Sequence, residues 1–164
     1  MSLKSLPPDL ALRPATNADC RAVTDLIVGI LARYGLSPDH TTTDIDLTDL
    51  VGFYHKAGGC FDVLVEQGSE RIIGTVGLHP MDARSVELRK MYLDTAFCGR
   101  GLGRFLLEHA LAEARRREFQ RVVLETATVL KEALQLYRSA GFQPCEAMHP
   151  AAKRCDMTME LLLA

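Results

Sequence analysis

The chain has 164 residues, of which 48% are hydrophobic and 24% are charged, and its formal net charge at pH 7 is −2. This is an ordinary globular composition, and it excludes disordered and fibrous proteins. The slightly acidic balance argues against nucleic-acid binding, because backbone phosphates require a basic protein surface. We expect a single domain over residues 1–164, with a core from about residue 12 to residue 163.

The N-terminal part of the chain is predicted to form one strand and two helices. Residues 10–14 form the strand, and residues 16–34 contain a capped helix whose apolar side chains recur with the 3.6-residue period. Thr43 and Asp46 have the spacing of a capping box, which predicts a second helix that ends near His55.

The middle of the chain is predicted to form an antiparallel meander. Residues 61–66 and 71–78 are strands joined by a turn that contains glycine, and residues 86–93 form a third strand.

The C-terminal half is predicted to alternate helices and strands. A helix begins at Leu102, a strand covers residues 122–126, and a second helix covers residues 129–140. Apolar and polar residues alternate over residues 155–163, as expected for a half-buried final strand. The whole pattern predicts a mixed sheet flanked by helices.

Neither the cysteines nor the histidines indicate a disulfide framework or a metal site. The five cysteines are odd in number and contain no C-x-x-C pair, so we expect them to be reduced. The five histidines lack ligand spacing, so no metal is expected. No apolar run is long enough for a membrane span or a signal peptide, and we therefore expect a cytoplasmic protein without a membrane partner.

Residues 97–104, Phe-Cys-Gly-Arg-Gly-Leu-Gly-Arg, form a glycine-rich turn that leads into a predicted helix. A helix N-terminus offers free backbone N–H groups and a partial positive charge, so this junction predicts a phosphate or pyrophosphate site. Its glycine spacing fits neither G-x-G-x-x-G nor the P-loop pattern. A dinucleotide domain would also need an acidic residue about 20 positions later, which Glu125 nearly supplies. A nucleotide-binding protein therefore remains an alternative.

The segment Cys98-Gly99-Arg100-Gly101-Leu102-Gly103 resembles the pyrophosphate motif [Gln/Arg]-x-x-Gly-x-[Gly/Ala] of the GNAT (GCN5-related) N-acyltransferases, which use acetyl-coenzyme A. Cys98 stands where the family usually has Gln or Arg. The resemblance extends to residues 87–93 as the family's fourth strand. It also covers Ala133-x-x-x-Tyr137-x-x-x-Gly141-Phe142 as the late helix and turn.

The resemblance implies an α/β fold with a mixed, mostly antiparallel central sheet. The sheet would have about six to seven strands, flanked by about four helices, and would be splayed between its fourth and fifth strands to hold coenzyme A. The implied contacts to acetyl-coenzyme A are Met91, Tyr92, Leu93, Cys98, Gly99, Arg100, Gly101, Leu102, Gly103, Arg104, Thr126, Leu130 and Tyr137. Leu130 replaces an asparagine that is common in the family, and Thr126 or Thr128 is a candidate to compensate.

The implied reaction needs a base, because an alkyl ammonium with a pKa of ~10.4 must lose a proton before it attacks a thioester. Glu87 matches a catalytic glutamate of some family members. The alternative is an exposed strand carboxylate paired with Arg89 or Lys90. A backbone N–H within residues 91–93 would bind the oxyanion.

Departure of the thiolate, whose conjugate acid has a pKa of about 8.5, is helped by a proton donor. Tyr137 resembles the family's donor, and the alternative is a tyrosine that simply packs in the core. Cys98 lies at a helix entrance that could lower its pKa, but a covalent acetyl-cysteine route is the lesser hypothesis.

The acceptor is expected to be a small amine or a protein amine, bound by residues 35–56 and 145–153. Four aspartates in the first of these segments weakly favour a cationic amine: Asp39, Asp44, Asp46 and Asp49. We expect an acetyl-coenzyme A-dependent N-acetyltransferase, as a monomer or a homodimer. A non-catalytic acyl-coenzyme A binding or sensing module is the chief alternative.

Overall fold

All strands that the structure describes belong to one mixed sheet with the order β1-β2-β3-β4-β5-β7-β6. The structure is a computed structural model that describes residues 5–147 and 153–164. Neighbouring strands are antiparallel except β4 and β5, which are parallel. The strands are β1 (Leu10–Pro14), β2 (Cys60–Glu66), β3 (Ile72–Pro80), β4 (Ser85–Leu93), β5 (Arg121–Thr126), β6 (Gln143–Pro144) and β7 (Met157–Leu162).

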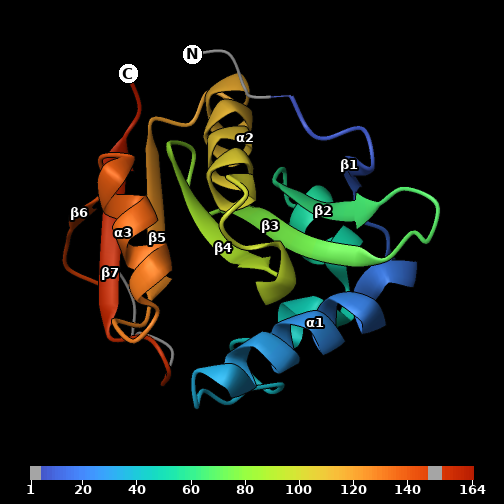
Figure 1. Cartoon of the computed structure of the whole chain (residues 1–164). Coiled ribbons are helices and arrows are strands. Elements are labelled where there is room, and N and C mark those ends of the chain that lie inside the picture. The colour runs from blue at the N-terminus through green and yellow to red at the C-terminus, as the bar shows by residue number, and fades with distance from the viewer. Residues whose placement is uncertain (1–4, 148–152) are drawn as a thin grey trace.

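Helices cover both faces of this sheet, with α2 on one face and α1 on the other (Figure 1). The α-helices are α1 (Cys20–Arg33), α2 (Leu102–Arg116) and α3 (Lys131–Ser139). Short helical turns are η1 (Asn17–Asp19), η2 (Ile45–Thr48), η3 (Val51–His55) and η4 (Thr95–Phe97). Each face has its own apolar core: one includes α2 and α3, the other α1, η2 and η3. The predicted α/β fold is confirmed.

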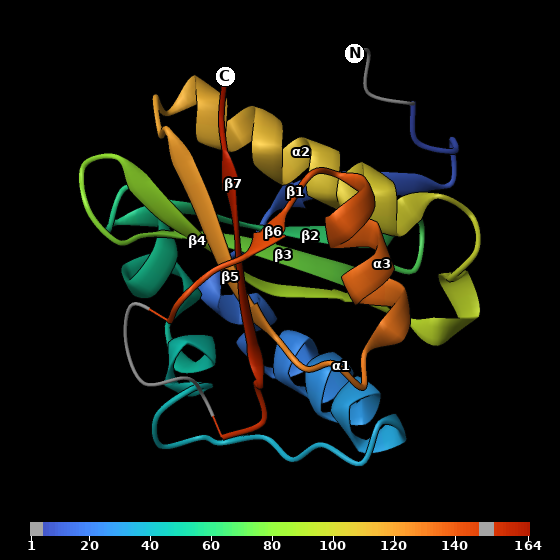
Figure 2. The same ribbon diagram turned by 90° about the vertical axis from the view of Figure 1, so that its left-hand side faces the viewer.

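The sheet divides where β4 and β5 separate. These two strands pair only from Ser85 with Arg121 to Leu88 with Leu124. Beyond that point β4 continues beside β3 and β5 continues beside β7. Figure 1 shows the two strands diverging, and in Figure 2 β7 stands nearly upright whereas β2 and β3 run across the view. The splay expected between the fourth and fifth strands is confirmed.

The first helix forms as its sequence predicts. Thr16 and Asp19 make a reciprocal capping box, in which the Asp19 carboxylate accepts the Thr16 backbone N–H at 2.8 Å. Val23, Ile27, Ile30 and Leu31 then form the buried stripe of α1.

The predicted second helix is wrong as a continuous element. The chain breaks it into η2 and η3 at Asp49, whose φ of −150° is extended and whose carboxylate accepts the Gly52 N–H at 2.8 Å. Asp49 thus caps a new turn. The expected capping box of Thr43 and Asp46 does not form, because the Asp46 side chain points into the protein and is 1% exposed.

The remaining differences are small. The two-residue strand β6 was not predicted, because so short a segment carries no alternation to detect. All five cysteines are free thiols, as expected. In the part of the chain that the structure describes, no helix has the length and apolar character to cross a membrane.

Candidate active site

A cavity of about 620 Å³ lies where β4 and β5 separate. Its walls come from α1, the second half of β4, the end of β5, the N-terminus of α2 and the first turns of α3. It brings together most of the predicted site residues, namely Glu87, Met91, Tyr92, Leu93, Cys98, Gly99, Gly101, Gly103, Arg104, Thr126, Leu130 and Tyr137.

Two predicted contact residues lie outside this lining. The Arg100 guanidinium stacks over the Phe97 ring, with its central carbon 5.0 Å from the ring centroid. Leu102 is 3% exposed and packs in the core. The side chain of Leu102 is therefore committed to packing, whereas that of Arg100 is exposed and lies against Phe97.

The glycine turn has the geometry of an anion site. Gly99 and Gly101 have φ values of 80° and 78°, in the left-handed region that favours glycine. Gly101 is the N-cap of α2, and its carbonyl accepts the first helical hydrogen bond, from the Phe105 N–H at 3.0 Å. The N–H groups of the first turn therefore face the cavity end without helical partners, and the helix dipole favours a negative ligand there.

A β-bulge in β4 borders the same cavity. The register with β3 shifts between Thr75 and Gly77, so that β4 has one extra residue at this point. Lys90 lies in the bulge with a φ of 52°, and its carbonyl accepts a hydrogen bond from the Thr75 hydroxyl at 2.6 Å. The bulge follows directly after the last β4–β5 pair, so the backbone of residues 91–93 lies where β5 has already diverged.

Glu87 lies on β4 beside Arg89. Its side chain is buried rather than exposed, and its Oε2 lies 3.2 Å from Arg89 Nη1. The pairing with Arg89 that was the structural alternative therefore exists, while Lys90 is directed elsewhere. Glu87 nevertheless lines the cavity, so this ion pair holds its carboxylate at the cavity wall.

Tyr137 belongs to both the core and the cavity. Its ring lies 5.8 Å from that of Phe142, and the residue is 6% exposed. Burial raises the pKa of Tyr137, so its hydroxyl is protonated at neutral pH and is a weaker acid than that of an exposed tyrosine. The residue packs in the core and also lines the cavity, so its packing does not remove it from the site.

Comparison with known proteins identifies the family. Residues 26–142 match the model described as Acetyltransferase (GNAT) family. The chain belongs to the GNAT acetyltransferase family.

Relatives and solved structures agree with this assignment. The chain is 34% identical over 142 residues to the uncharacterized N-acetyltransferase YjgM of Escherichia coli (strain K12), with 84% of each chain covered. It is 36% identical over 100 residues to the N-acetylaspartate synthetase of Danio rerio, which covers 60% of this chain but only 35% of that longer relative.

In fold, the GNAT acetyltransferase of Staphylococcus aureus Mu50 matches with a TM-score of 0.87 at 19% identity, over 94% of this chain and 99% of the other. The yncA protein of Salmonella typhimurium, solved with acetyl-CoA, gives 0.73 at 24% identity over 95% of each chain. The family match and the relationship to the E. coli N-acetyltransferase, rather than these structures, make this GNAT chain an acyltransferase.

Cys98 does not have the environment of a nucleophile in this GNAT protein. Partial burial, together with the carboxylates of Asp94 and Glu132, raises the pKa of the Cys98 thiol. The helix entrance was a reason to consider a lowered pKa, but burial and then these two carboxylates disfavour a thiolate here. The covalent route has no support from this geometry.

The position of the family's usual asparagine is occupied by Leu130, which lines the cavity just before α3. Of the two threonines proposed to compensate, Thr126 lines the cavity. Thr128 is already used, because its hydroxyl donates to Asp156 at 2.7 Å. Thr126 is therefore the better placed of the two.

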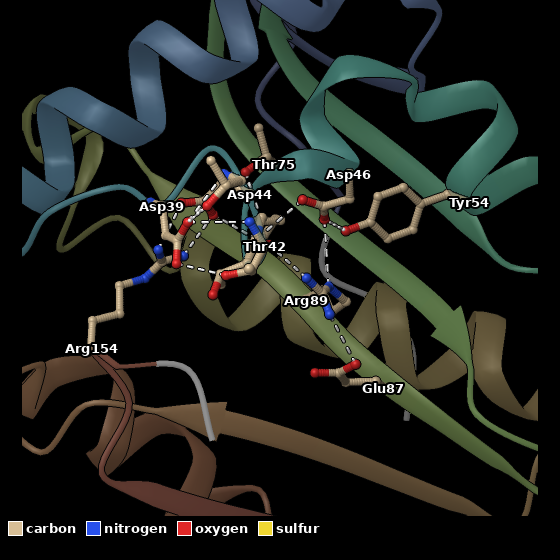
Figure 3. Close-up of polar contacts among 12 residues, drawn as sticks. Asp39, Thr42, Asp44, Asp46, Tyr54, Thr75, Glu87, Arg89 and Arg154 are labelled. Carbon is tan, nitrogen blue, oxygen red and sulfur yellow. Dashed lines mark hydrogen bonds and ion pairs between the residues drawn. The ribbon is translucent and has the colours of Figure 1, made fainter. Parts of the chain in front are cut away.

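The expected acidic acceptor surface is instead a buried group of paired charges, which we call the ion-pair hub (Figure 3). Asp44 and Asp46 are 2% and 1% exposed. Three cations and three carboxylates form the hub: Arg89, Lys90 and Arg154 with Asp44, Asp46 and Glu87. The other two aspartates of this segment, Asp39 and Asp49, accept hydrogen bonds from nearby groups. The basis for preferring a cationic acceptor is therefore lost.

Arg154 is the main site residue that sequence reasoning missed. It lines the cavity and donates two hydrogen bonds to Asp44, at 2.7 and 2.8 Å. The two residues are 110 positions apart, and no local pattern links them. The second predicted acceptor segment, residues 145–153, lies partly outside the described residues, which do not include 148–152.

Proposed function

We propose that this GNAT protein transfers an acetyl group from acetyl-coenzyme A directly to a primary amine. The observation that carries this proposal is the cavity at the β4–β5 divergence, because Glu87, the bulged β4 backbone, the glycine turn and Tyr137 all border it. The family assignment supports acetyl-coenzyme A as the donor, and the related yncA structure contains acetyl-CoA.

The donor end is the N-terminus of α2. Backbone N–H groups of the glycine turn and the first helical turn would bind the diphosphate, with Arg104 adding positive charge at the cavity wall. The β4 backbone at residues 91–93 and the Thr126 hydroxyl would bind the amide groups of the pantetheine arm, and Leu130 would contact its apolar parts.

Glu87 is the proposed base. An alkyl ammonium has a pKa of ~10.4, so the amine must give up a proton before its lone pair attacks the thioester carbon. Arg89 binds Oε2 of Glu87, and we assign proton transfer, directly or through one water molecule, to Oε1.

The negative charge that develops on the thioester oxygen would be stabilised by backbone N–H groups of residues 91–93. Collapse of the tetrahedral intermediate breaks the carbon–sulfur bond. The Tyr137 hydroxyl, which borders the cavity, would donate its proton to the departing sulfur. The attacking nitrogen still carries one proton more than the amide product, and it would pass this proton to the Tyr137 phenolate, directly or through water. The products are an N-acetyl amine and coenzyme A.

The acceptor is a primary amine of a small molecule or a protein. The hub pairs equal numbers of cations and carboxylates, so it gives no preference for a cationic acceptor. The zebrafish relative is named for the synthesis of N-acetylaspartate. A screen of acceptors should therefore include free amino acids together with polyamines and peptides.

The first test is the thermal midpoint with and without acetyl-coenzyme A. A ligand at 100 times its Kd adds about 2.7 kcal/mol of stability, so we expect a clear upward shift. A shift with NAD or ATP, and none with coenzyme A, would support a nucleotide-binding protein instead. Binding of acetyl-coenzyme A without thiol release for any amine would support a non-catalytic binding module.

The second test is Tyr137→Phe, which keeps the ring that packs on Phe142 and removes only the hydroxyl. We expect kcat to fall about 100-fold or more, with the thermal shift by acetyl-coenzyme A retained. Unchanged kcat in the folded variant would remove Tyr137 from the mechanism.

A further inference from the structure

The bulge in β4 has an unusual anchor. Lys90 is one of three residues other than glycine with a positive φ in the described chain, and the left-handed region is disfavoured for a side chain with a Cβ. Its side chain is 4% exposed. The ammonium lies 2.9 Å from the Thr43 carbonyl, 2.8 Å from Asp44 Oδ1 and 3.4 Å from Asp46 Oδ1. The two short contacts, to the Thr43 carbonyl and to Asp44, therefore fix the ammonium, and Asp46 adds a longer ion pair, so the side chain of Lys90 helps to hold the bulge.

Asp44 is the residue on which this anchor converges. Its carboxylate accepts from Lys90, from both terminal nitrogens of Arg154 and from the Asp39 backbone N–H, the last at 2.8 Å. It therefore joins the loop after α1, strand β4 and the segment before β7 (Figure 3). Asp44 is 2% exposed and is not part of the cavity lining, so it does not contact a ligand in the cavity.

The contacts of Lys90 matter because the bulge lies directly before the β4 residues that line the cavity. Residues 91–93 follow Lys90 directly, and their backbone lines the cavity after β5 has diverged. Rotation of the peptide between Lys90 and Met91 would move the Met91 N–H. We propose that Asp44 is a positioning residue that, through Lys90, holds the backbone N–H groups of residues 91–93 in place for the oxyanion. This inference rests on the proposed acetyl transfer.

The charge of Asp44 is essential to this role. Without the charge of Asp44, the buried ammonium keeps only the more distant Asp46 carboxylate, at 3.4 Å. A buried charge that is so poorly compensated would move toward solvent or lose its proton. The bulge would then depend on the hydrogen bond from Thr75 to the Lys90 carbonyl, so the peptide that leads to Met91 would be less well fixed, while the glycine turn at the other end of the cavity is unaffected.

The test is Asp44→Asn, which keeps the shape and removes the charge. We expect kcat to fall at least tenfold, because a misplaced oxyanion donor acts only on the transition state. The KM for acetyl-coenzyme A and the thermal shift that it causes should change less than twofold. In protein labelled with ¹⁵N-methionine, the Met91 amide resonance should move.

A double-mutant cycle with Lys90→Met tests the route of the effect. If Asp44 acts through Lys90, the double variant should lose no more kcat than the more impaired single variant. Losses that multiply would overturn the inference. If Asp44→Asn does not fold, Lys90→Met alone serves, since it leaves the pair of Asp44 with Arg154 intact; it should show the same loss of kcat and the same Met91 shift.

Arg13→Met is the matched control. Arg13 pairs with Asp19 through two contacts of 2.8 and 2.9 Å, a geometry like that of Arg154 with Asp44, but outside the cavity lining. Its kcat and Met91 resonance should stay at the wild-type values. A wild-type kcat in folded Asp44→Asn would contradict the inference, and so would a loss of kcat in Arg13→Met equal to that in Asp44→Asn. If the wild-type chain acetylates no amine, the proposed function fails, and the Met91 resonance alone decides whether Asp44 positions this backbone.

Discussion

The two ends of the cavity handle charge by different means. At the α2 end, charge is provided by the backbone: Gly99 and Gly101 have positive φ values, and the N–H groups of the first helical turn have no helical partners. At the β4 bulge, charge is provided by side chains. The buried charges of the ion-pair hub come from segments that are far apart in the sequence. Side-chain substitutions should therefore have little effect on stability at the α2 end, provided that the glycines are kept. At the β4 bulge they should destabilise the protein.

The largest effect should follow a change at the centre of the hub. Asp46 has a fully buried side chain that contacts Arg89, Lys90 and the Tyr54 hydroxyl. Asp46→Asn leaves three buried cations with two carboxylates, because Arg89 keeps Glu87 and Lys90 keeps Asp44. This excess of buried positive charge should lower the free energy of unfolding by about 3–5 kcal/mol, measured in urea.

The matched control for this change is Asp49→Asn, three residues later. Asp49 is exposed, and its Oδ1 accepts the Gly52 N–H; asparagine keeps this acceptor and caps as well as aspartate, so the change should cost less than about 0.5 kcal/mol. Similar losses in the two variants would show that the hub is no more sensitive to charge than the surface.

Lowering the pH should reduce the stability that the ion-pair hub contributes to the fold. Burial alone would raise the pKa of Asp44, but hydrogen bonds from Arg154 and Lys90 more than offset it and hold this pKa well below its usual value of 3.8. The resulting stabilisation is present above about pH 4 and is lost as the pH falls toward the lower folded-state pKa. The unfolding midpoint of Asp44→Asn should consequently depend less on pH between about 4 and 2 than that of the wild type. Equal slopes would contradict the pairing.

At the glycine turn, the sensitive property is the backbone. Gly101→Ala would place a Cβ at a φ of 78°, although no other atom lies within 4 Å of it. We expect a cost of about 1–2 kcal/mol and weaker binding of acetyl-coenzyme A, measured by titration calorimetry. Gly29→Ala is the control: Gly29 lies within α1 with the same free space, so the change should stabilise the protein by roughly 0.5–1 kcal/mol.

The smallest effect should come from Cys98→Ala. Its thiol has a raised pKa, and the proposed contacts of the turn with acetyl-coenzyme A are backbone N–H groups, so stability should change by less than about 0.5 kcal/mol and kcat hardly at all. Loss of activity would revive the covalent route. Cys98→Arg, which restores a residue usual in the family, should tighten acetyl-coenzyme A binding.

The same contrast explains how much the sequence could predict. The capping box of Thr16 with Asp19, the stripe of α1 and the glycine turn are local, because each depends on residues within a few positions of one another. The divergence of β4 from β5 was expected from the family resemblance rather than from periodicity, and the pairing that ends at Leu88 confirms it.

The hub could not be predicted in this way. Asp46 has the spacing of a cap and is instead buried, because Arg89 and Tyr54 lie near it only in the folded chain. Arg154 reaches Asp44 across the splayed sheet, and a single sequence contains no signal for such a pair. Thr128 illustrates the same limit, since its hydroxyl is engaged by Asp156 from a later segment.

The contact between Arg154 and Asp44 has a consequence for the order of folding. The entropy cost of closing a loop grows with its length, and 110 positions separate these residues, whereas the glycine turn and α2 are contiguous. We expect the α2 end of the cavity to acquire its structure early and the end near Arg154 to be completed late. Pulse-labelled hydrogen exchange during refolding would show this as protection of the α2 amides before those of β7. On the proposed function, the part of the cavity assigned to acetyl-coenzyme A would then be in place before the part near the acceptor.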